Sequence, residues 1–422
     1  MSDPSRIKAL RDPVAVTHDG ETVTMERGQP LAAGLVAAGR LLLARSPKLH
    51  RARGPSCFRG ACDGCTMRVN GVPNVMTCLV SARGGERIET QNVLGSREVD
   101  LYEATDLLFP EGFDHHRLLA GSGASNLLTS FARRMSGLGT LPDEVLAVRP
   151  AEQREIRVLI VGGGAAGLAA ATVLGKNALL VDDALGLGGS LAALDPREAV
   201  NLLQRARAAG AELWHATTAI SLSREPEDGS GRLHATLDGP EHATHVRCET
   251  VIVASGGHDT PIEFGNNDLP GVFSARALLK LWRSGISVGE RVALIGDGRF
   301  ARALAEARKH QGVFHFPPER VKRAKGQHAV SRLVYEESGK LRELVVSAIG
   351  CDGPLAPAVE LLGQLGATLH FDAARGYVPR LSATGEAAPG VFAAGSCAAS
   401  VLPSAQDGER VGLSVLRGFR TS

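Results

Sequence analysis

Ile156-Arg157-Val158-Leu159-Ile160-Val161-Gly162-Gly163-Gly164-Ala165-Ala166-Gly167 is the stretch that decides the fold of this chain. Its first half is a mostly apolar run that predicts a buried strand. The glycines follow that strand, and a helix is expected over residues 168–175, which is the context of a dinucleotide-binding unit. Gly162 permits the tight turn, Gly164 lets the backbone approach a pyrophosphate, and Gly167 permits close helix packing. The helix N-terminus offers N–H groups and positive dipole to phosphates.

Later signatures extend this site. Asp182 ends a second predicted strand, residues 178–181, twenty residues after Gly162, where a carboxylate is expected to meet ribose hydroxyls. The segments at 188–190, 254–256 and 395–396 resemble the further signatures of flavoproteins with two dinucleotide domains, which favours FAD over NAD; those flavoproteins usually carry Asp at position 396. A nucleotide fold that has lost its ligand is the alternative. The candidate FAD-binding residues are Gly162, Gly164, Ala166, Gly167, Asp182, Gly188, Gly189, Ser190, Ala254, Gly256, Gly395 and Ser396.

A second glycine turn, Gly296-Asp297-Gly298-Arg299-Phe300-Ala301, follows the predicted strand 291–295. In flavoproteins with two dinucleotide domains the inserted domain normally binds NAD(P)H. Here, however, Phe316 stands twenty residues after Gly296, where a carboxylate is expected. The chain before Lys325 is also too short for the usual second strand, crossover and third strand. The basic residues within 320–325 could meet a 2′-phosphate, although a solvated basic stretch is favoured. NAD(P) binding is therefore not expected here.

Four cysteines lie within 22 residues at the spacing Cys57-x4-Cys62-x2-Cys65-x12-Cys78. Four thiolates satisfy a [2Fe-2S] cluster, and the small residues between them let backbone N–H groups approach the cluster sulfurs. A zinc site is the alternative, although its common form has two Cys-x2-Cys pairs and only one occurs here. The predicted metal ligands are Cys57, Cys62, Cys65 and Cys78, in a loop that resembles that of plant-type ferredoxins.

These motifs predict an α+β N-terminal β-grasp [2Fe-2S] domain followed by an α/β flavoprotein fold with two dinucleotide-binding domains. The first domain is expected over residues 1–100, with a hairpin at 14–24, a helix at 31–44 and an Asn70-Gly71 turn. Residues 101–154 are interpreted as a connector. Residues 155–265 and 386–422 are assigned to the FAD-binding domain, and residues 266–385 to an inserted, degenerate NAD(P)-type domain.

Composition excludes several classes of protein. The chain of 422 residues is 44% hydrophobic and 22% charged, which is usual for globular proteins. Its net charge of +2 gives no reason to expect nucleic-acid binding. It has no apolar run long enough for a membrane span, and its polar N-terminus is unlike a signal peptide. Clustered cysteines indicate a metal site in a reducing compartment, so a cytoplasmic location is expected.

With these parts in order, the chain resembles the α subunit of the heterotetrameric sarcosine oxidase group, which includes hydrogen cyanide synthase, opine oxidases and hetero-oligomeric proline dehydrogenases. The resemblance is carried also by residues 48–54, 264–271 and 357–366. It implies that an amine is oxidised on a flavin in a separate, amino-acid-oxidase-like β subunit, and that this chain relays electrons to an external acceptor. The substrate is not implied, since its pocket would lie on another chain.

The sequence leaves two further functions open. One is a self-contained NAD(P)H-dependent reductase that passes electrons through FAD to its own cluster, and the other is a scaffold with vestigial sites. A cationic patch of His50, Arg51 and Arg53 could hold the phosphate of an FMN at a subunit interface or dock an acidic partner, or it could be a solvated loop. No motif for acid-base catalysis is found, so no catalytic residue is predicted.

Overall fold

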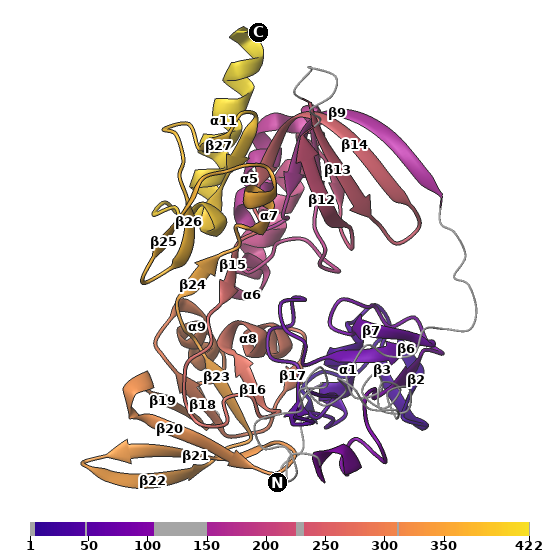
Figure 1. Cartoon of the computed structure of the whole chain (residues 1–422), viewed down its shortest axis with the longest axis vertical. Coiled ribbons are helices and arrows are strands. Elements are labelled where there is room, and N and C mark those ends of the chain that lie inside the picture. The colour runs from indigo at the N-terminus through magenta and orange to yellow at the C-terminus, as the bar shows by residue number, and fades with distance from the viewer. Residues whose placement is uncertain (1–4, 47–48, 105–149, 225–231, 310–311, 422) are drawn as a thin grey trace, which may run out of the picture. The chain divides into compact units, whose positions relative to one another are not determined.

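The computed structural model describes residues 5–46, 49–104, 150–224, 232–309 and 312–421. Its contacts divide the chain into two compact units (Figure 1). Unit 1 consists of residues 1–145 and 261–353, and unit 2 consists of residues 146–260 and 354–422. Most of the predicted connector, residues 105–149, lies outside the described residues. None of the described helices combines the length and apolar character needed to cross a membrane.

The N-terminal part of unit 1 is built on a five-stranded sheet in the order β3-β2-β8-β6-β7. The predicted hairpin is present, because Asp19 and Gly20 both adopt the positive φ that a tight turn between β2 and β3 requires. Asn70 and Gly71 make the same kind of turn between β6 and β7. The strands are β1 Ser5–Arg6, β2 Pro13–His18, β3 Glu21–Glu26, β4 Ala44–Arg45, β5 Ala52–Arg53, β6 Thr66–Val69, β7 Val72–Met76 and β8 Arg87–Glu89, and η1 spans Leu101–Ala104.

The helix predicted over residues 31–44 is shorter than expected. Helix α1 spans Leu31–Ala37 and packs against Met25 of β3. Gly39 has a φ of +80°, and the Arg40 N–H donates to the Leu35 carbonyl at 3.0 Å, which closes the last turn. The chain then forms the short β4–β5 hairpin instead of continuing the helix.

The second part of unit 1 contains a four-stranded parallel sheet in the order β16-β23-β18-β19. A three-stranded antiparallel sheet, β20-β21-β22, follows β19 in the chain. The second strand expected after the glycine turn at Gly296 is present as β19, at the edge of the four-stranded sheet. The elements are β16 Val272–Ser274, α8 Ala275–Arg283, β17 Ile286–Ser287, β18 Val292–Ile295, α9 Arg299–Ala307, β19 Val313–Phe316, η3 Pro318–Arg320, β20 Val321–Gly326, β21 Val330–Glu337, β22 Lys340–Val345 and β23 Ala348–Cys351.

Unit 2 is built on an eight-stranded sheet with the path β11-β10-β9-β14-β13-β12, and β28 pairs with the end of β14. Strands β9, β10, β11, β14 and β28 run parallel, so their carboxyl ends meet at one edge of the sheet. The strands are β9 Ala151–Val161, β10 Ala178–Val181, β11 Glu212–Trp214, β12 Thr218–Arg224, β13 Leu233–Asp238, β14 Ala243–Val253, β27 Glu386–Ala388 and β28 Val391–Ala393.

Helices α5, α7 and α11 lie together beside this sheet (Figure 1). Gly408 of α11 approaches α5 so closely that an added Cβ would lie 2.0 Å from the Ala166 carbonyl oxygen. The remaining elements of unit 2 are α5 Ala165–Leu174, η2 Gly175–Asn177, α6 Leu191–Leu194, α7 Pro196–Ala208, β15 Gly257–Asp259, β24 Leu355–Pro357, α10 Glu360–Gln364, β25 Leu369–Asp372, β26 Gly376–Pro379, η4 Gly395–Ala398 and α11 Ser404–Thr421.

The fold class predicted from the sequence is confirmed by these two units. Residues 354–385, which the sequence analysis assigns to the inserted domain, cluster with unit 2, where β24 pairs with β15 and Leu362 is buried in the core of the large sheet. The domain boundaries given above stay a prediction.

Candidate functional site

The cysteine loop of unit 1 depends on glycines for its path. Phe58 and Gly60 have φ values of +50° and +71°, so the backbone turns sharply between the first two cysteines. An added Cβ on Gly64 would lie 1.9 Å from the Gly54 carbonyl oxygen, which leaves room only for glycine. Cys57, Cys65 and Cys78 are buried and Cys62 is partly exposed.

The four thiols are arranged as two hydrogen-bonded pairs. The bond from the Cys57 thiol lowers the pKa of Cys62 to about 6, while the same bond and burial raise the pKa of Cys57. In the second pair, the bond from Cys65 lowers the pKa of Cys78 and raises its own. A lowered pKa favours the thiolate forms of Cys62 and Cys78, and thiolates are the form that binds iron.

Backbone N–H groups of the loop point at these sulfurs. Those of Ser56, Cys57 and Gly64 reach the Cys62 sulfur, and that of Gly60 reaches Cys78. Two thiol pairs match a cluster in which each of two irons takes two thiolates, and N–H donors stabilise such clusters. Among the described side chains, no three His, Cys, Asp or Glu residues form a group suited to a single metal ion. This donor set fits a [2Fe-2S] cluster.

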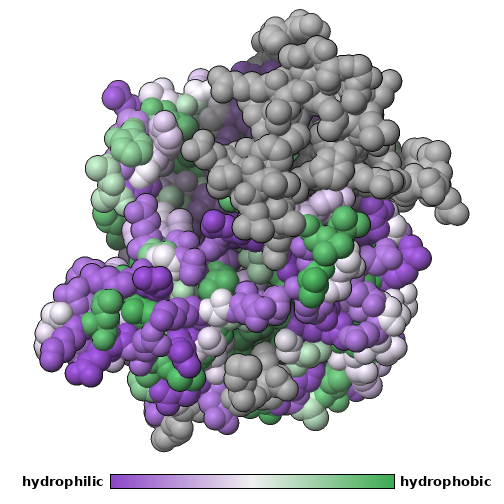
Figure 2. Space-filling model, turned by 60° about the horizontal axis from the view of Figure 1, so that its bottom comes forward, coloured by the Kyte–Doolittle hydropathy of each residue, from purple (hydrophilic) through white to green (hydrophobic). Residues whose placement is uncertain are grey.

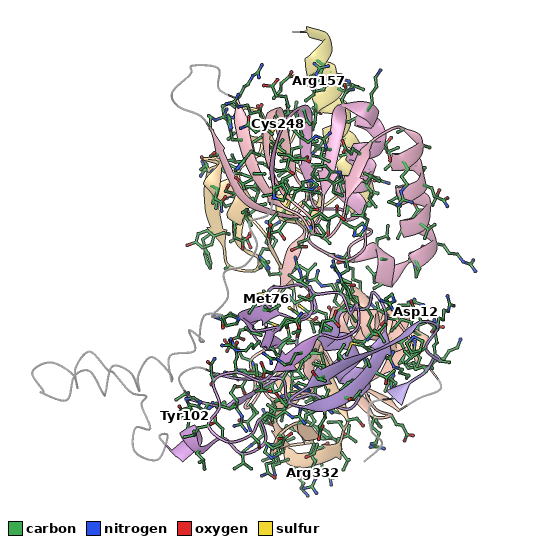
Figure 3. All side chains as sticks on the ribbon, turned by 90° about the vertical axis from the view of Figure 1, so that its right-hand side faces the viewer. Asp12, Met76, Tyr102, Arg157, Cys248 and Arg332 are labelled. Atoms are coloured by element: carbon green, nitrogen blue, oxygen red, sulfur yellow. The ribbon has the colours of Figure 1, made fainter. Side chains whose placement is uncertain are left out.

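The other cysteines are packing residues. Cys248 lies among the strands of the large sheet (Figure 3), and burial raises its pKa to about 12. Burial also raises the pKa of Cys351 to about 12. Cys397 is fully buried, with its sulfur 3.1 Å from the Val253 carbonyl oxygen. Burial is the main cause of the raised pKa in these three, whereas the loop cysteines shift one another's pKa as pairs.

The cationic patch predicted beside the cysteine loop is not formed as expected. His50 is fully buried and its Nδ1 lies 3.0 Å from an Asp100 carboxylate oxygen, which is buried too. Arg53 forms an ion pair with Asp268. Arg51 alone of the three is exposed. His50, through Nδ1, and Arg53 therefore have partners within unit 1, whereas the buried Nε2 of His50 has no hydrogen-bond partner among the described residues.

The first glycine turn of unit 2 has the geometry that the sequence predicts. Gly162 has a φ of +114°, and an added Cβ there would lie 2.3 Å from the Ala254 carbonyl oxygen. An added Cβ on Gly167 would lie 1.8 Å from the Gly162 carbonyl oxygen. At Gly164, the N-cap of α5, an added Cβ would meet nothing within 4 Å. The space above Gly164 is therefore open for a ligand at the N-terminus of α5.

Other predicted residues gather around this turn. The Gly188 N–H donates to the Gly163 carbonyl at 2.8 Å, and Gly189 lies against the Gly164 backbone. Gly395, with a φ of +78°, lies against the Cβ of Ala166. Ser190 and Ser396 follow these glycines in the chain, at the N-cap of α6 and in η4. Gly256 follows β14 with a φ of +81° and open space at its Cβ position.

Asp182 stands at the end of β10 with both carboxylate oxygens engaged. One accepts from the Gly163 N–H at 2.5 Å and the other from the Ala184 N–H at 2.8 Å. Asp182 thus lies beside the glycine turn at the carboxyl end of β10, where dinucleotide-binding folds place the acid that binds ribose hydroxyls. The open turn, the helix N-terminus and this acid together fit the adenosine and pyrophosphate of a dinucleotide.

Sequence reasoning missed Asp407 in the first turn of α11. It is fully buried, and one carboxylate oxygen accepts from the Gly395 N–H at 2.7 Å while the other accepts from Arg410 at 2.8 Å. It thereby fixes the loop that carries Gly395 and Ser396. Its sequence signal is weak, because nothing in the local pattern links an acid in α11 to a loop twelve residues earlier.

The second glycine turn, in unit 1, is built on the same hydrogen-bond plan. Gly296 donates to Phe316 as Gly162 donates to Val181, at 3.0 and 2.8 Å. Because β18 pairs Ile295 with Phe316, the counterpart of Asp182 is the next residue, Pro317. The residue count had pointed to Phe316, and the spacing here is one residue longer. Proline has no side-chain acceptor for a ribose hydroxyl.

Most of the basic stretch after this turn lies in β20, and its first residue, Arg320, ends η3. Lys322 pairs with Glu336 at 2.9 Å, and Lys325 pairs with Glu343 at 2.5 Å, across the three-stranded sheet. Figure 2 shows mostly hydrophilic side chains over the β21–β22 hairpin, which projects to the left. This agrees with a solvated basic stretch rather than a site for a 2′-phosphate.

Together the cysteine loop and the strand–glycine–helix units define a class: an N-terminal 2Fe-2S domain joined to a flavoprotein-type, dinucleotide-binding oxidoreductase fold. Residues 11–93 match the family of 2Fe-2S iron-sulfur cluster binding domains. The chain is similar to sarcosine oxidase subunit alpha from Rhizobium meliloti, with 27% identity over 403 residues, 83% of this chain and 40% of that protein. The subunit alpha from Corynebacterium sp. strain U-96 is also 27% identical, over 70% of this chain and 30% of that protein.

These comparisons confirm the resemblance to sarcosine oxidase α subunits that the sequence motifs indicate. The chain spans about two fifths or less of the length of these curated relatives. Among solved structures, L-proline dehydrogenase from P. horikoshii matches 99% of this chain and 76% of its own, with a TM-score of 0.76 and 22% identity. Thioredoxin reductase from T. acidophilum matches 63% of this chain and 99% of its own, with a TM-score of 0.51 and 19% identity. Both likenesses concern the fold.

Proposed function

We propose that this chain is the electron-transferring subunit of a multi-subunit amine or amino-acid oxidase or dehydrogenase, acting on a substrate of the sarcosine, proline, glycine or opine type. Its cofactors are FAD in unit 2 and a [2Fe-2S] cluster on Cys57, Cys62, Cys65 and Cys78. When bound, FAD supplies two-electron chemistry and the cluster passes single electrons. An amino-acid-oxidase-like β subunit delivers the electrons, and an external acceptor removes them.

The observation that carries this proposal is the contrast between the two glycine turns. The turn at Gly164 is open. The turn at Gly298 has no acid at the position that would bind a ribose, and a carboxylate occupies the space that a phosphate would need. Of the two glycine turns within the described residues, the one at Gly164 is open for a dinucleotide, and the later flavoprotein signatures lie around it. The similarity to sarcosine oxidase α subunits supports a partner chain as the source of electrons. The clustering of four cysteines in one loop, as a metal site, favours a reducing compartment, the cytoplasm.

The residues of this chain have three roles in the proposal. The N–H groups at the N-terminus of α5 bind the FAD pyrophosphate, and Asp182 binds the adenosine ribose. Asp407 positions the loop of Gly395 and Ser396 beside the flavin. The buried thiols of the cysteine loop hold the cluster while Cys62, which is partly exposed, marks the side from which an acceptor approaches. FMN at a subunit interface stays a prediction.

Mixing the FAD-loaded chain with excess NADH under anaerobic conditions tests the function directly. We expect no loss of flavin absorbance at about 450 nm over minutes, and full loss on adding dithionite. Hydride transfer needs the nicotinamide held against the flavin, and the second glycine turn lacks the ribose acid that would help to bind it. A thioredoxin reductase serves as the positive control. Rapid, complete reduction by NADH would instead establish the alternative, a self-contained NAD(P)H-dependent reductase.

A further inference from the structure

A carboxylate of this same chain, that of Asp352, lies at the N-terminus of helix α9. The Ala301 N–H, in the first turn of α9, donates to an Asp352 carboxylate oxygen at 2.6 Å. An added Cβ on Gly298 would lie 2.5 Å from Asp352 Oδ2 and 2.7 Å from Oδ1. The carboxylate therefore covers the face of Gly298 where the backbone of such a turn approaches a pyrophosphate.

The placement of Asp352 follows from the sheet. Strands β18 and β23 run parallel with Ile295 opposite Cys351, so both strands end at the same edge. The Asp352 N–H donates to the Ile295 carbonyl at 2.9 Å, and an added Cβ on Gly296 would lie 2.5 Å from the Asp352 carbonyl oxygen. Its side chain consequently projects over the glycine turn and onto the positive end of α9.

The first glycine turn provides the comparison within the same chain. Ala254 takes the place of Asp352 there: its N–H donates to the Val161 carbonyl at 2.7 Å, and its carbonyl oxygen lies against Gly162. Alanine has no group that could reach the helix N-terminus. The position above Gly164 is open, whereas the equivalent position above Gly298 is filled by a carboxylate.

We propose that Asp352 is a specificity-determining residue that excludes nicotinamide dinucleotides from the second glycine turn by occupying their pyrophosphate position. Two effects act together, because the carboxylate fills the space and its negative charge repels a phosphate. An open cavity of about 710 Å³, lined in part by Gly296, Phe316 and Pro317, still lies beside the turn. Space for an adenosine is thus retained, and the phosphate position is what is closed. This inference deepens the proposed function, in which electrons do not come from NAD(P)H.

Isothermal titration of the FAD-loaded chain with NADH tests this proposal. We expect no NADH binding to the wild type up to about 1 mM. Asp352→Ala, which removes the charge repulsion, is expected to bind NADH at least about tenfold more tightly, and a tenfold change in affinity equals about 1.4 kcal/mol. Asp352→Asn keeps an acceptor for the Ala301 N–H and so tests the charge alone; it is expected to gain less. The matched control is Asp297→Ala, which removes an exposed carboxylate from the same turn.

Two results would overturn the proposal. One is micromolar binding of NADH to the wild type, and the other is a folded Asp352→Ala variant that binds NADH no better than wild type and Asp297→Ala. Folding is checked by circular dichroism and FAD content, and if Asp352→Ala does not fold, Asp352→Ser, which also clears the space above Gly298 and removes the charge, decides by the same criterion. Neither outcome depends on the proposed function, because binding is measured without turnover and flavin reduction is measured separately.

Discussion

A Cys62→Ser variant is expected to purify with about a tenth or less of the wild-type iron and with no iron-sulfur absorbance, since a [2Fe-2S] cluster needs all four thiolates. Cys62 is the member of its pair whose pKa is lowered to about 6, and three backbone N–H groups point at its sulfur. A serine hydroxyl remains protonated near neutral pH and is a poor iron ligand. Iron and acid-labile sulfide analysis measures the loss, and extracted FAD is expected to stay at the wild-type level.

Cys351→Ser is the control for this prediction. Cys351 is partly buried at the end of β23, outside the cysteine loop, and burial raises the pKa of its thiol to about 12. The variant is expected to keep about two irons per chain. A normal cluster in Cys62→Ser, or equal iron loss in both variants, would show that the ligand assignment is wrong.

Gly164→Val is expected to weaken FAD binding by roughly 100-fold, which equals about 2.8 kcal/mol. The backbone of Gly164, with φ −77° and ψ −170°, suits any residue, and an added Cβ meets no protein atom within 4 Å. The substitution therefore leaves the fold in place and fills the space that a pyrophosphate needs. It also separates the ligand from N–H donors, and hydrogen bonds to charged groups are worth about 1.5–3 kcal/mol each.

Gly363→Val provides the matched control, because an added Cβ there makes only an ordinary contact at 3.7 Å with Leu369. Gly363 lies in helix α10, which is far from the glycine turn in the sequence. Fluorescence titration of the apoprotein with FAD gives both affinities, and thermal melts of the apoproteins check the folds. Equal FAD affinities of the two variants would place the cofactor elsewhere.

The sequence predicted those parts of the fold that depend on local pattern. The apolar run before Gly162 and the turn residues Asp19-Gly20 and Asn70-Gly71 determine their own conformations, and the structure contains all of them. The end of α1 was predicted too late because apolar residues continue at helical spacing past Gly39, whose left-handed conformation stops the helix. The spacing of apolar residues does not reveal that a single residue adopts a positive φ.

The features that the sequence did not predict depend on strand register. Pro317 rather than Phe316 is the counterpart of Asp182, because the second unit has one more residue between the paired strands. Asp352 lies 51 residues after Ala301, and only the pairing of β18 with β23 brings its carboxylate to that N–H. His50 and Asp100 also lie far apart in the sequence, with 50 residues between their positions. Such contacts have no local signal.

The central claim, that electrons on the flavin of this chain pass to its cluster, has one direct test. The FAD-loaded, iron-containing chain is reduced with light and EDTA under anaerobic conditions, which delivers electrons to the flavin, and low-temperature EPR then follows the cluster. We predict the EPR signal of a reduced [2Fe-2S] cluster in the wild type and its absence in Cys62→Ser. Full bleaching of the wild-type flavin with a cluster that stays oxidised would contradict the account.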